Sequence, residues 1–430
     1  MVTTPKQNPN SRVWYRYYAG YTEEFVASLI GHLGIRRNSW VLDPWNGAGT
    51  TTAVAHRLGY KSIGLDVNPA LVLIGKARSL DVNVLPSIAP LCADIWSKAT
   101  DLRRKQLASS EDPLRCWFSA RSANTLRCIE AAINELLVSE ASYVPLTSSL
   151  GMAQASSLAS FFYQALFLSV RHFLGEFTTT NPTWITKATN GDFVTADARV
   201  VHRLFREATA HLASCLTKAS LETDRLHSPV ISLGRSEQIR AHVGQVGAVI
   251  GSPPYCTRID YAVNTLPELA VLRFGSVPSE FRLLRNQMMG TPTMTSVAPE
   301  EPLSCWGAKA GRFVADVTRH ASKASSTYYR KYFLQYYDSL YRSLESIAGV
   351  LRPGGACAIV VQDSYYKEVH NDLAGIVQQM GATAGMPVVD RLDFSVPRVR
   401  AQMNARARAY RSNFTATESA VILKRSREAQ

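Results

Sequence analysis

The chain has 430 residues, of which 46% are hydrophobic and 19% are charged, a balance that is typical of globular proteins and excludes a disordered chain. The formal net charge of +13 at pH 7 favours polyanionic partners such as nucleic acid, although ribosome-associated and merely basic proteins share it. No apolar run approaches the roughly 18 residues of a membrane span, and the N-terminus lacks the apolar centre of a secretory signal. We therefore expect a soluble cytoplasmic protein with no membrane partner.

The seven cysteines carry no signal for a metal or a disulfide framework. They are scattered, odd in number and never arranged as C-x-x-C. Zinc sites and disulfide scaffolds depend on such spacing, so we expect no metal and no disulfides.

The first strong pattern lies at residues 38–78, NSWVLDPWNGAGTTTAVAHRLGYKSIGLDVNPALVLIGKAR. It predicts a buried strand at 40–42, a helix at 50–58 that Gly59 closes, and a second strand at 61–65. Together these elements form a β-α-β unit.

The loop of this unit indicates a ligand. Gly47 and Gly49 let the backbone approach a ligand at the helix N-terminus, and Asp66 can accept hydrogen bonds from ribose hydroxyls. Taken alone, the two glycines also fit a plain strand-to-helix turn. Asp43, which precedes them, would repel a pyrophosphate but suits an ammonium or sulfonium group, so a cationic nucleoside is the better hypothesis than NAD.

About 150 residues separate this unit from the next strong strand, which is far more than a usual connection. Ala, Ser and Leu recur there at helical spacing, which predicts a largely helical insertion. Its aromatic residues are interpreted as core rather than as a base-stacking surface, namely Phe161, Phe162, Phe167 and Phe173. Residues 175–193 break the pattern and are either an exposed loop that reaches DNA or a plain connector.

The second strong pattern is GAVIGSPPYCTRIDY at residues 247–261. An apolar strand ends there in Ser252-Pro253-Pro254-Tyr255, and the two prolines remove two backbone donors and impose an extended path. A chain that only leaves a sheet rarely does so in this way. We therefore expect this strand end to hold a substrate group.

The C-terminal part combines a helix, two strands and a basic run. An amphipathic helix extends to Leu351 and leads into an apolar strand through Pro353-Gly354-Gly355. Five arginines follow within a span that contains no carboxylate, which indicates either a solvated face or contacts with DNA phosphates. They are Arg398, Arg400, Arg406, Arg408 and Arg411.

The stretches DPWNGAGTT, GLDVNP and SPPY together resemble the motifs of the S-adenosylmethionine-dependent amino-DNA methyltransferases, in the Ser-Pro-Pro-Tyr variant. The resemblance is good over 38–78 and 246–261 and looser elsewhere, at 17–30, 350–364 and 418–425. It implies an α/β fold, a doubly wound class I methyltransferase sheet that is mostly parallel with its last strand antiparallel. The helical segment would be an insertion into this sheet.

The resemblance also implies a division of the chain. The first part of the methyltransferase domain takes residues 1–90, with a pre-catalytic helix and the cofactor-binding β-α-β unit. A helical insertion that could recognise the target takes 91–228, and the catalytic strand takes 229–270. A second, irregular insertion takes 271–325, and the C-terminal part of the domain takes 326–430.

The resemblance implies S-adenosylmethionine as the cofactor. Asp94 is one candidate for the polar residue on the adenine side, and the stretch at 231–239 offers Ser236 or Glu237. We favour the later stretch because it directly precedes the catalytic strand, as the resemblance implies. Trp45 stands where the family usually carries Phe. The predicted cofactor-binding residues are Tyr17, Tyr21, Asp43, Pro44, Trp45, Gly47, Gly49, Thr50, Thr51, Asp66, Val67, Asn68 and Ser236.

The Ser-Pro-Pro-Tyr turn is the predicted catalytic site. An aromatic exocyclic amine is a poor nucleophile, so the Ser252 hydroxyl and the Pro253 carbonyl would accept its hydrogen bonds while the methyl group arrives. Pro254 would fix the turn, and the ring of Tyr255 would stack on a flipped base. Cys256, which follows, is interpreted as a packed residue rather than a nucleophile.

The expected activity is methylation of N4 of cytosine in double-stranded DNA by base flipping. Ser252 favours cytosine, whereas N6 of adenine is the alternative within the family. A structured-RNA methyltransferase and a catalytically silent DNA-binding relative are further alternatives. A restriction or defence-system partner is compatible with this activity.

Overall fold

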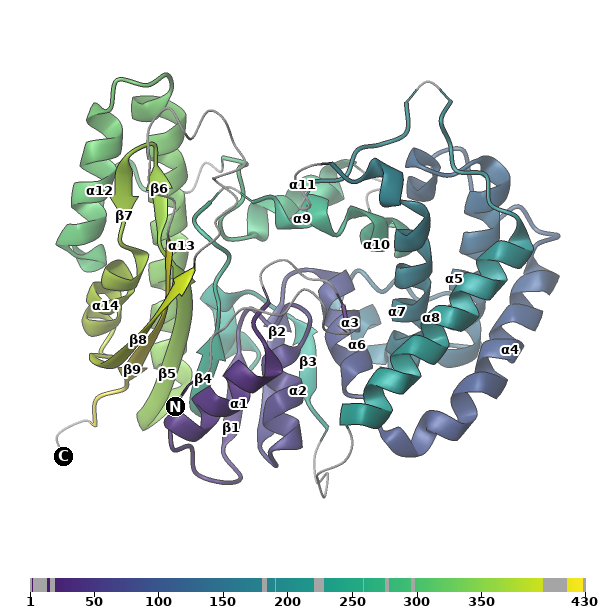
Figure 1. Ribbon diagram of the computed structural model, residues 1–430, viewed down its shortest axis with the longest axis horizontal. Helices are drawn as coiled ribbons and strands as arrows, with labels where there is room; N and C mark the ends of the chain where they lie inside the picture. Colours follow the sequence, from purple (N-terminus) through teal and green to yellow (C-terminus); the bar gives the residue numbers. More distant parts are fainter. Residues whose placement is uncertain are drawn as a thin grey trace.

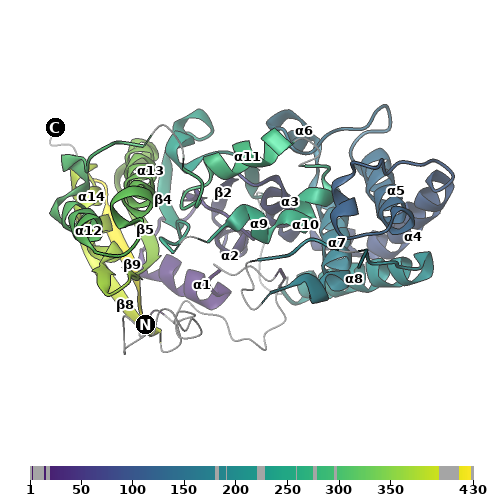
Figure 2. The same cartoon turned by 90° about the horizontal axis from the view of Figure 1, so that it is seen from above.

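The structure is a computed structural model, and it describes residues 2, 14–15, 20–179, 184–189, 191–219, 228–257, 259–274, 278–294, 298–396 and 416–427. A β-sheet lies in the middle of the molecule, with a group of helices at each end (Figure 1). The view from above shows the same order, with α4, α5 and α8 at one end and α12 and α14 at the other (Figure 2).

The central sheet has seven strands among the described residues, in the order β3-β2-β1-β4-β5-β9-β8. The strands from β3 to β5 pair in parallel, and β9 is antiparallel to both of its neighbours. The predicted doubly wound sheet with an antiparallel last strand is therefore confirmed. The strands are β1 (Trp40–Asp43), β2 (Lys61–Asp66), β3 (Val230–Leu233), β4 (Val246–Gly251), β5 (Leu351–Gln362), β8 (Val388–Val396) and β9 (Ala416–Lys424).

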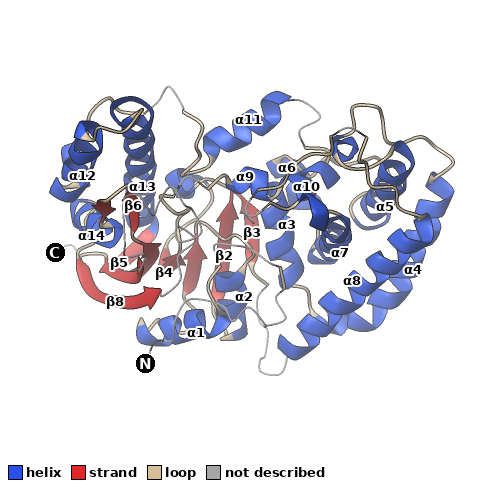
Figure 3. Cartoon of the chain, turned by 45° about the horizontal axis from the view of Figure 1, so that its top comes forward, coloured by secondary structure: helices blue, strands red, loops and turns tan. Residues whose placement is uncertain are grey.

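Helices cover both faces of the sheet (Figure 3). Alternate residues of a strand point to opposite faces, so Val41 packs against α1 and α2 whereas Leu42 packs against the cluster that contains α13 and α14. Both residues are buried, as expected for a parallel strand between two helical layers. The helices are α1 (Glu23–His32), α2 (Thr50–Arg57), α13 (Arg330–Val350) and α14 (Leu373–Thr383).

The predicted β-α-β unit forms with only small shifts at its ends. β1, α2 and β2 cover the predicted strand, helix and strand, and α3 (Pro69–Arg78) continues the winding. Because β1, β2, β3 and β4 run in parallel, their carboxyl ends meet at one edge of the sheet. The cofactor motifs and the Ser-Pro-Pro-Tyr turn are brought together there.

A helical lobe, consisting of α4 to α8, lies between α3 and β3 in the chain. Phe161, Phe162 and Phe167 are fully buried in its core, which confirms their interpretation as packing residues, and Phe173 packs against the same core. The predicted start at residue 91 is wrong, since it falls inside α4, which has Pro86 in its first turn. The helices are α4 (Leu85–Leu102), α5 (Ala120–Leu137), α6 (Ser149–Gln154), α7 (Ser157–Phe173) and α8 (Ala198–Ala219).

The segment after β4 is largely helical, including the part from 271 to 325 that was predicted to be irregular. α9, α10 and α11 lie above the carboxyl edge of the sheet, between the helical lobe and the α12 end (Figure 1). The segment predicted to be irregular contains α11 and α12, and α12 has a buried apolar stripe that includes Phe313 and Val317. These helices are α9 (Tyr261–Asn264), α10 (Leu266–Val271), α11 (Pro278–Gln287) and α12 (Ala308–Arg319).

The C-terminal strands follow the predicted order. β5 and β9 cover the two predicted strand stretches, and a hairpin of β6 (Ser364–Tyr366) and β7 (Val369–Asn371) follows β5. The five arginines at 398–411 lie outside the described residues. None of the helices in the described part of the chain is long and apolar enough to cross a membrane.

Buried charges join the helical lobe to α10. The guanidinium of Arg127 on α5 is fully buried, forms two hydrogen bonds of 2.9 Å with Asp112, and donates to the carbonyl oxygens of Ala270 and Val271. Arg171 on α7 donates to both carboxylate oxygens of Glu268, at 2.6 and 2.7 Å. Because buried charges require partners, the lobe and α10 have a fixed mutual position.

Candidate cofactor and substrate pocket

The turn after β1 is shaped by two glycines with positive φ. Gly47 has φ 50° and Gly49 has φ 77°, and Gly49 is the N-cap of α2. A Cβ atom at Gly49 would lie 2.9 Å from the Cα of Gly75 on α3. Gly49 is therefore required for the close packing of this turn on α3. Although it was predicted to bind the cofactor, it does not line the pocket.

Asp66, at the end of β2, fixes the same turn. Its carboxylate accepts hydrogen bonds from the backbone N–H of Gly47 and of Asn68, both at 2.9 Å. Asn68 is fully buried, caps α3 through the N–H of Ala70, and donates to the hydroxyl of Thr265 at 2.6 Å. Asp66 thus faces the pocket, whereas Asn68 supports it from behind.

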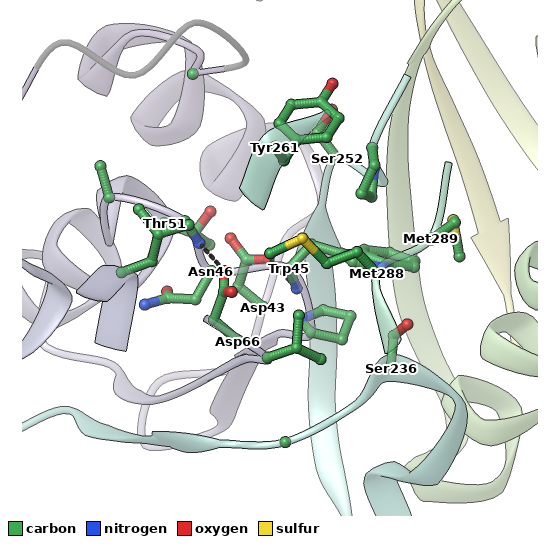
Figure 4. Close-up of a pocket in the computed structure, with 18 of the residues that line it drawn as sticks. Asp43, Trp45, Asn46, Thr51, Asp66, Ser236, Ser252, Tyr261, Met288 and Met289 are labelled. Atoms are coloured by element: carbon green, nitrogen blue, oxygen red, sulfur yellow. Dashed lines mark hydrogen bonds between the residues drawn. The ribbon is translucent and has the colours of Figure 1, made fainter. Parts of the chain in front are cut away.

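A pocket opens at the carboxyl edge of the sheet, with about 860 Å³ of empty space that includes its opening to solvent. Figure 4 shows Asp43 and Asp66 on one side, Ser252 and Tyr261 at another, and the side chain of Met288 between them. The lining residues are Gly20, Tyr21, Asp43, Pro44, Trp45, Asn46, Gly47, Ala48, Thr50, Thr51, Asp66, Val67, Leu71, Gly234, Ser236, Glu237, Ser252, Pro254, Tyr261, Gln287, Met288 and Met289.

The pocket is electronegative. Asp43 is 2% exposed, and burial raises its pKa to about 6 although Trp45 N–H and the Tyr21 hydroxyl donate to it at 3.0 and 3.2 Å. Burial also raises the pKa of Asp66 to about 6. None of the described lining residues is Lys, Arg or His. A cationic ligand would therefore favour the ionised form of both carboxyl groups.

One polar hydrogen at this end of the pocket lacks a partner. The indole Nε1 of Trp45 is buried without a hydrogen-bond partner in the described part of the chain. The amide Nδ2 of Asn46 also lacks one, but it lies behind the turn, against Gly64 and Gly75. Buried donors are usually satisfied by a ligand or a water molecule. Together with the two carboxylates, the Trp45 N–H suits a cationic nucleoside, which offers positive charge and several acceptors.

The Ser-Pro-Pro-Tyr turn forms the other end of the pocket. The hydroxyl of Ser252 donates to the carbonyl of Val360 on β5 at 2.9 Å, so its oxygen presents lone pairs to other groups. The hydroxyl of Tyr336 donates to the carbonyl of Pro254 at 2.8 Å. The phenol of Tyr255 donates to Glu418 on β9 at 2.9 Å. The turn is thus fixed from three elements.

The predicted site residues fall into three groups. Tyr17 and the five C-terminal arginines lie outside the described residues. Gly49, Asn68, Pro253 and Tyr255 are described but do not line the pocket. The residues that do line it are Tyr21, Asp43, Pro44, Trp45, Gly47, Thr50, Thr51, Asp66, Val67, Ser236, Ser252 and Pro254.

The favoured stretch for the adenine side reaches the pocket, and the alternative does not. Ser236 and Glu237 follow β3 and both line the pocket, with the Ser236 hydroxyl 2.9 Å from that of Ser343. Asp94 lies on the exposed side of α4. Cys256 is 3% exposed and burial raises its pKa, which supports its interpretation as a packed residue.

Several pocket residues carried no recognisable signal in the sequence. Tyr261 begins α9, and Gln287, Met288 and Met289 follow one another at the end of α11. No motif marks them, because their approach depends on the packing of α9 and α11 over the sheet edge. Among the described residues, no group of three or more His, Cys, Asp and Glu side chains is arranged to hold a metal ion.

The match to a protein family concerns the N-terminal part of the chain. Residues 3–77 match the family described as "DNA methylase", N6_N4_Mtase. This match confirms the predicted resemblance to the amino-DNA methyltransferases over these residues. The Ser-Pro-Pro-Tyr turn lies outside the matched residues.

Individual relatives cover short segments. The chain is 40% identical to "Type II methyltransferase M.BsoBI" of Geobacillus stearothermophilus over 63 residues. This segment makes up 15% of this chain and 12% of that protein. Over 77 residues it is 34% identical to "Type II methyltransferase M2.LlaDCHI" of Lactococcus lactis subsp. cremoris, which is 18% of this chain and 29% of that protein. The rRNA methyltransferase aviRa from Streptomyces viridochromogenes aligns with a TM-score of 0.30 and 10% identity, over 95% of this chain and 86% of that one.

Proposed function

We propose that this protein is a DNA methyltransferase that transfers a methyl group from S-adenosylmethionine to the exocyclic N4 amine of cytosine in double-stranded DNA. The target base would be flipped out of the duplex, because its amine cannot reach an enclosed pocket while it is paired. One observation carries the proposal. A single pocket is lined at one end by Asp43 and Asp66, and at the other by Ser252 and Pro254.

Asp43, Asp66 and Trp45 would hold the cofactor. Their buried carboxylates and the unpaired indole N–H fit a molecule that carries sulfonium and ammonium charges and acceptor atoms. When bound, S-adenosylmethionine supplies an electrophilic methyl group. The attraction between the Asp43 carboxylate and a cation is strong here, because Asp43 is buried in surroundings of low polarity.

Ser252 would hold the target amine. Its proton is donated to Val360, so toward the pocket its oxygen acts as an acceptor for an N–H group. Such an acceptor strengthens as the amine nitrogen becomes positively charged, and it would therefore stabilise the transition state more than the ground state. Pro253 does not line the pocket, so Ser252 is the acceptor that the turn offers there. Pro254 keeps the turn extended, and its carbonyl accepts a hydrogen bond from the Tyr336 hydroxyl.

The positive net charge supports a polyanionic substrate. We propose that the arginines at 398–411 contact DNA phosphates. Ser252 favours cytosine, and N6 of adenine is the alternative that the product analysis below tests. A restriction or defence-system partner remains compatible with such an activity.

The direct test is product analysis. DNA from cells that express the protein would be sequenced with a method that reports modified bases, and digested nucleosides would be analysed by mass spectrometry. N4-methylcytosine at a defined sequence supports the proposal. N6-methyladenine would show that adenine, the alternative, is the target base. If purified protein with S-adenosylmethionine methylates RNA but not DNA, or neither, the proposed function is wrong.

Cofactor binding can be tested separately with Met288→Trp. Met288 is 8% exposed and lies across the pocket, so an indole there should obstruct the cofactor and reduce its affinity in calorimetry at least about tenfold. Leu283→Trp is the matched control, because Leu283 is 59% exposed on α11, the helix that ends just before Met288. Equal affinity in both variants would contradict the assignment of the pocket.

A further inference from the structure

We propose that Glu418, on β9, positions the ring of Tyr255 for stacking on the target base. The resemblance gives Tyr255 this stacking role, and no sequence motif singled out a residue that orients its ring. The inference deepens the proposed function and rests on it. Glu418 would act through Tyr255, so it is a positioning residue rather than a catalytic one.

The side chain of Tyr255 is bound to β9 through its hydroxyl group. The phenol donates a hydrogen bond to Glu418 Oε1 at 2.9 Å. β5 lies between β9 and β4, the strand that the Ser-Pro-Pro-Tyr turn follows. Tyr255 and Glu418 therefore meet across the end of β5, over two strand spacings or roughly 10 Å. Tyr255 is itself only partly buried, as a ring that receives a base must be.

The backbone of the turn is fixed independently of Glu418. The Tyr336 hydroxyl donates to the carbonyl oxygen of Pro254 at 2.8 Å, and the N–H of Tyr255 donates to the hydroxyl of Tyr261 at 3.1 Å. These contacts do not determine the side-chain torsions of Tyr255. The hydrogen bond to Glu418 restricts these torsions and so defines the orientation of the ring.

Glu418 is itself held at the carboxyl edge of the sheet. β9 is antiparallel to β5, so its first residues lie beside the last residues of β5, and Glu418 is paired with Gln362. The neighbouring Thr417 exchanges hydrogen bonds of 2.7 and 3.0 Å with Asp363. Glu418 is also 3% exposed, so its side chain is packed. The acceptor for the phenol therefore has a defined position relative to the turn.

Packing alone does not require a carboxyl group at this position. Alternate residues of a strand share a face, and Ala420 and Ile422, two and four positions after Glu418, pack in the apolar cluster that contains α1 residues. A carboxyl group in such a row costs free energy unless it forms hydrogen bonds. The bond from Tyr255 offsets part of this cost, which indicates that the carboxyl group serves the substrate site.

The two residues assigned to the target base are bound to the same side of β4. Ser252 donates to Val360 of β5, and Tyr255 donates to Glu418 of β9, which is the next strand beyond β5. A base whose amine is held by Ser252 would lie over this side, with its ring on Tyr255. A ring that is already oriented loses little freedom when the base stacks on it, so the amine reaches the methyl group in the reactive geometry more often.

Three substitutions address the two ends of the hydrogen bond. Glu418→Gln keeps an acceptor in a side chain of the same shape, Glu418→Leu removes the acceptor, and Tyr255→Phe removes the donor but keeps the ring. Ser419→Ala is the matched control, because Ser419 is the next residue of β9, is 1% exposed and donates to Asp393. All would be compared with the wild type on a duplex that carries the sequence found in the product analysis.

The rate of single-turnover methylation should fall about 3- to 30-fold in Glu418→Leu and in Tyr255→Phe, which corresponds to the loss of one hydrogen bond. The dissociation constant of the DNA complex should change less than about twofold, because contacts with the phosphate backbone supply most of this affinity. Glu418→Gln and Ser419→Ala should retain the wild-type rate. All variants should bind S-adenosylmethionine as the wild type does.

The decisive measurement is the rate of the double variant Tyr255→Phe/Glu418→Leu. If Glu418 acts through the Tyr255 hydroxyl, this rate should be no lower than that of the slower single variant. Losses that multiply would overturn the inference, because Glu418 would then act independently of Tyr255. A loss in Glu418→Gln as large as in Glu418→Leu would also overturn it.

Two further outcomes complete the test. If circular dichroism shows that Glu418→Leu does not fold, Tyr255→Phe decides, and a wild-type rate in that variant would overturn the inference. A wild-type protein that methylates no DNA would instead refute the proposed function itself. The two failures are therefore distinguishable.

Discussion

Replacing Asp43 by Asn should stabilise the protein without cofactor and weaken its binding of S-adenosylmethionine. Asp43 is 2% exposed, and its pKa rises from 3.8 to about 6 because burial disfavours the charged form. The native state then binds the proton more tightly than the unfolded state. By linkage, the contribution of Asp43 to stability is complete below pH about 4 and is lost as the pH rises to about 6.

The size of this effect follows from the pKa difference. A shift of about two pKa units corresponds to about 3 kcal/mol. The free energy of unfolding is lower by this amount at pH 7.5, where Asp43 is ionised in the native state. An Asn carbonyl can still accept from the N–H of Trp45, and its NH₂ can donate to the hydroxyl of Tyr21. Asp43→Asn should therefore gain about 1–3 kcal/mol at pH 7.5 and little at pH 4.

The affinity for the cofactor should fall in Asp43→Asn, although the stability of the free protein rises. Removing one partner of a buried charge pair costs about 2–5 kcal/mol of binding, which is at least about 30-fold in the dissociation constant. Urea unfolding at pH 4 to 8 and calorimetry at pH 7.5 would measure both effects. Asp94→Asn on the exposed side of α4 is the control, with changes within about 0.5 kcal/mol. Loss of stability in Asp43→Asn at every pH, with cofactor affinity unchanged, would refute this reasoning.

Three further outcomes are expected. Ser252→Ala should lower the single-turnover rate more than it changes the affinity for DNA or cofactor, because the hydrogen bond to the amine strengthens in the transition state; equal loss in both quantities would contradict this. Arg127→Met should lower the free energy of urea unfolding by about 3–5 kcal/mol, since it leaves buried carboxylates without a counter-charge; a change below 1 kcal/mol would contradict a role for this cluster. Joint replacement by Gln in the C-terminal run should reduce the salt dependence of DNA binding by up to about three units, one per phosphate contact, and an unaltered slope would leave the run as a solvated face. The residues replaced together are Arg406, Arg408 and Arg411.

The parts of the site that were predicted from the sequence are those built from local contacts. Asp43, the glycine turn and Asp66 lie within 24 residues, and hydrophobic periodicity with glycine positions defines their strands and helix. The end of β4 was also predicted from the sequence, because its apolar run stops just before two prolines. Such features depend on neighbours in the chain, which the sequence displays directly.

The remaining parts depend on contacts between distant segments. Met288 reaches the pocket because α11 lies over the sheet edge, where Arg285 pairs with Asp260. Gly49 was predicted as a ligand contact, but a residue 26 positions later, Gly75, determines its role. Tyr255 is held by Glu418, 163 positions away. No local pattern of hydrophobicity or turn chemistry contains these relations.

The helical lobe and the pocket are connected through a short series of buried contacts. Arg171 of the lobe binds Glu268, which is 1% exposed on α10, and the hydroxyl of Tyr15 donates to the same carboxylate at 3.0 Å. α10 directly follows α9, which begins with Tyr261 and thereby contacts the Ser-Pro-Pro-Tyr turn. A change in the position of the lobe would have to carry α10 with it, because separation would leave Glu268 buried without its cation. Removal of the lobe would therefore destabilise α10 rather than leave the sheet and its helices as an independent domain.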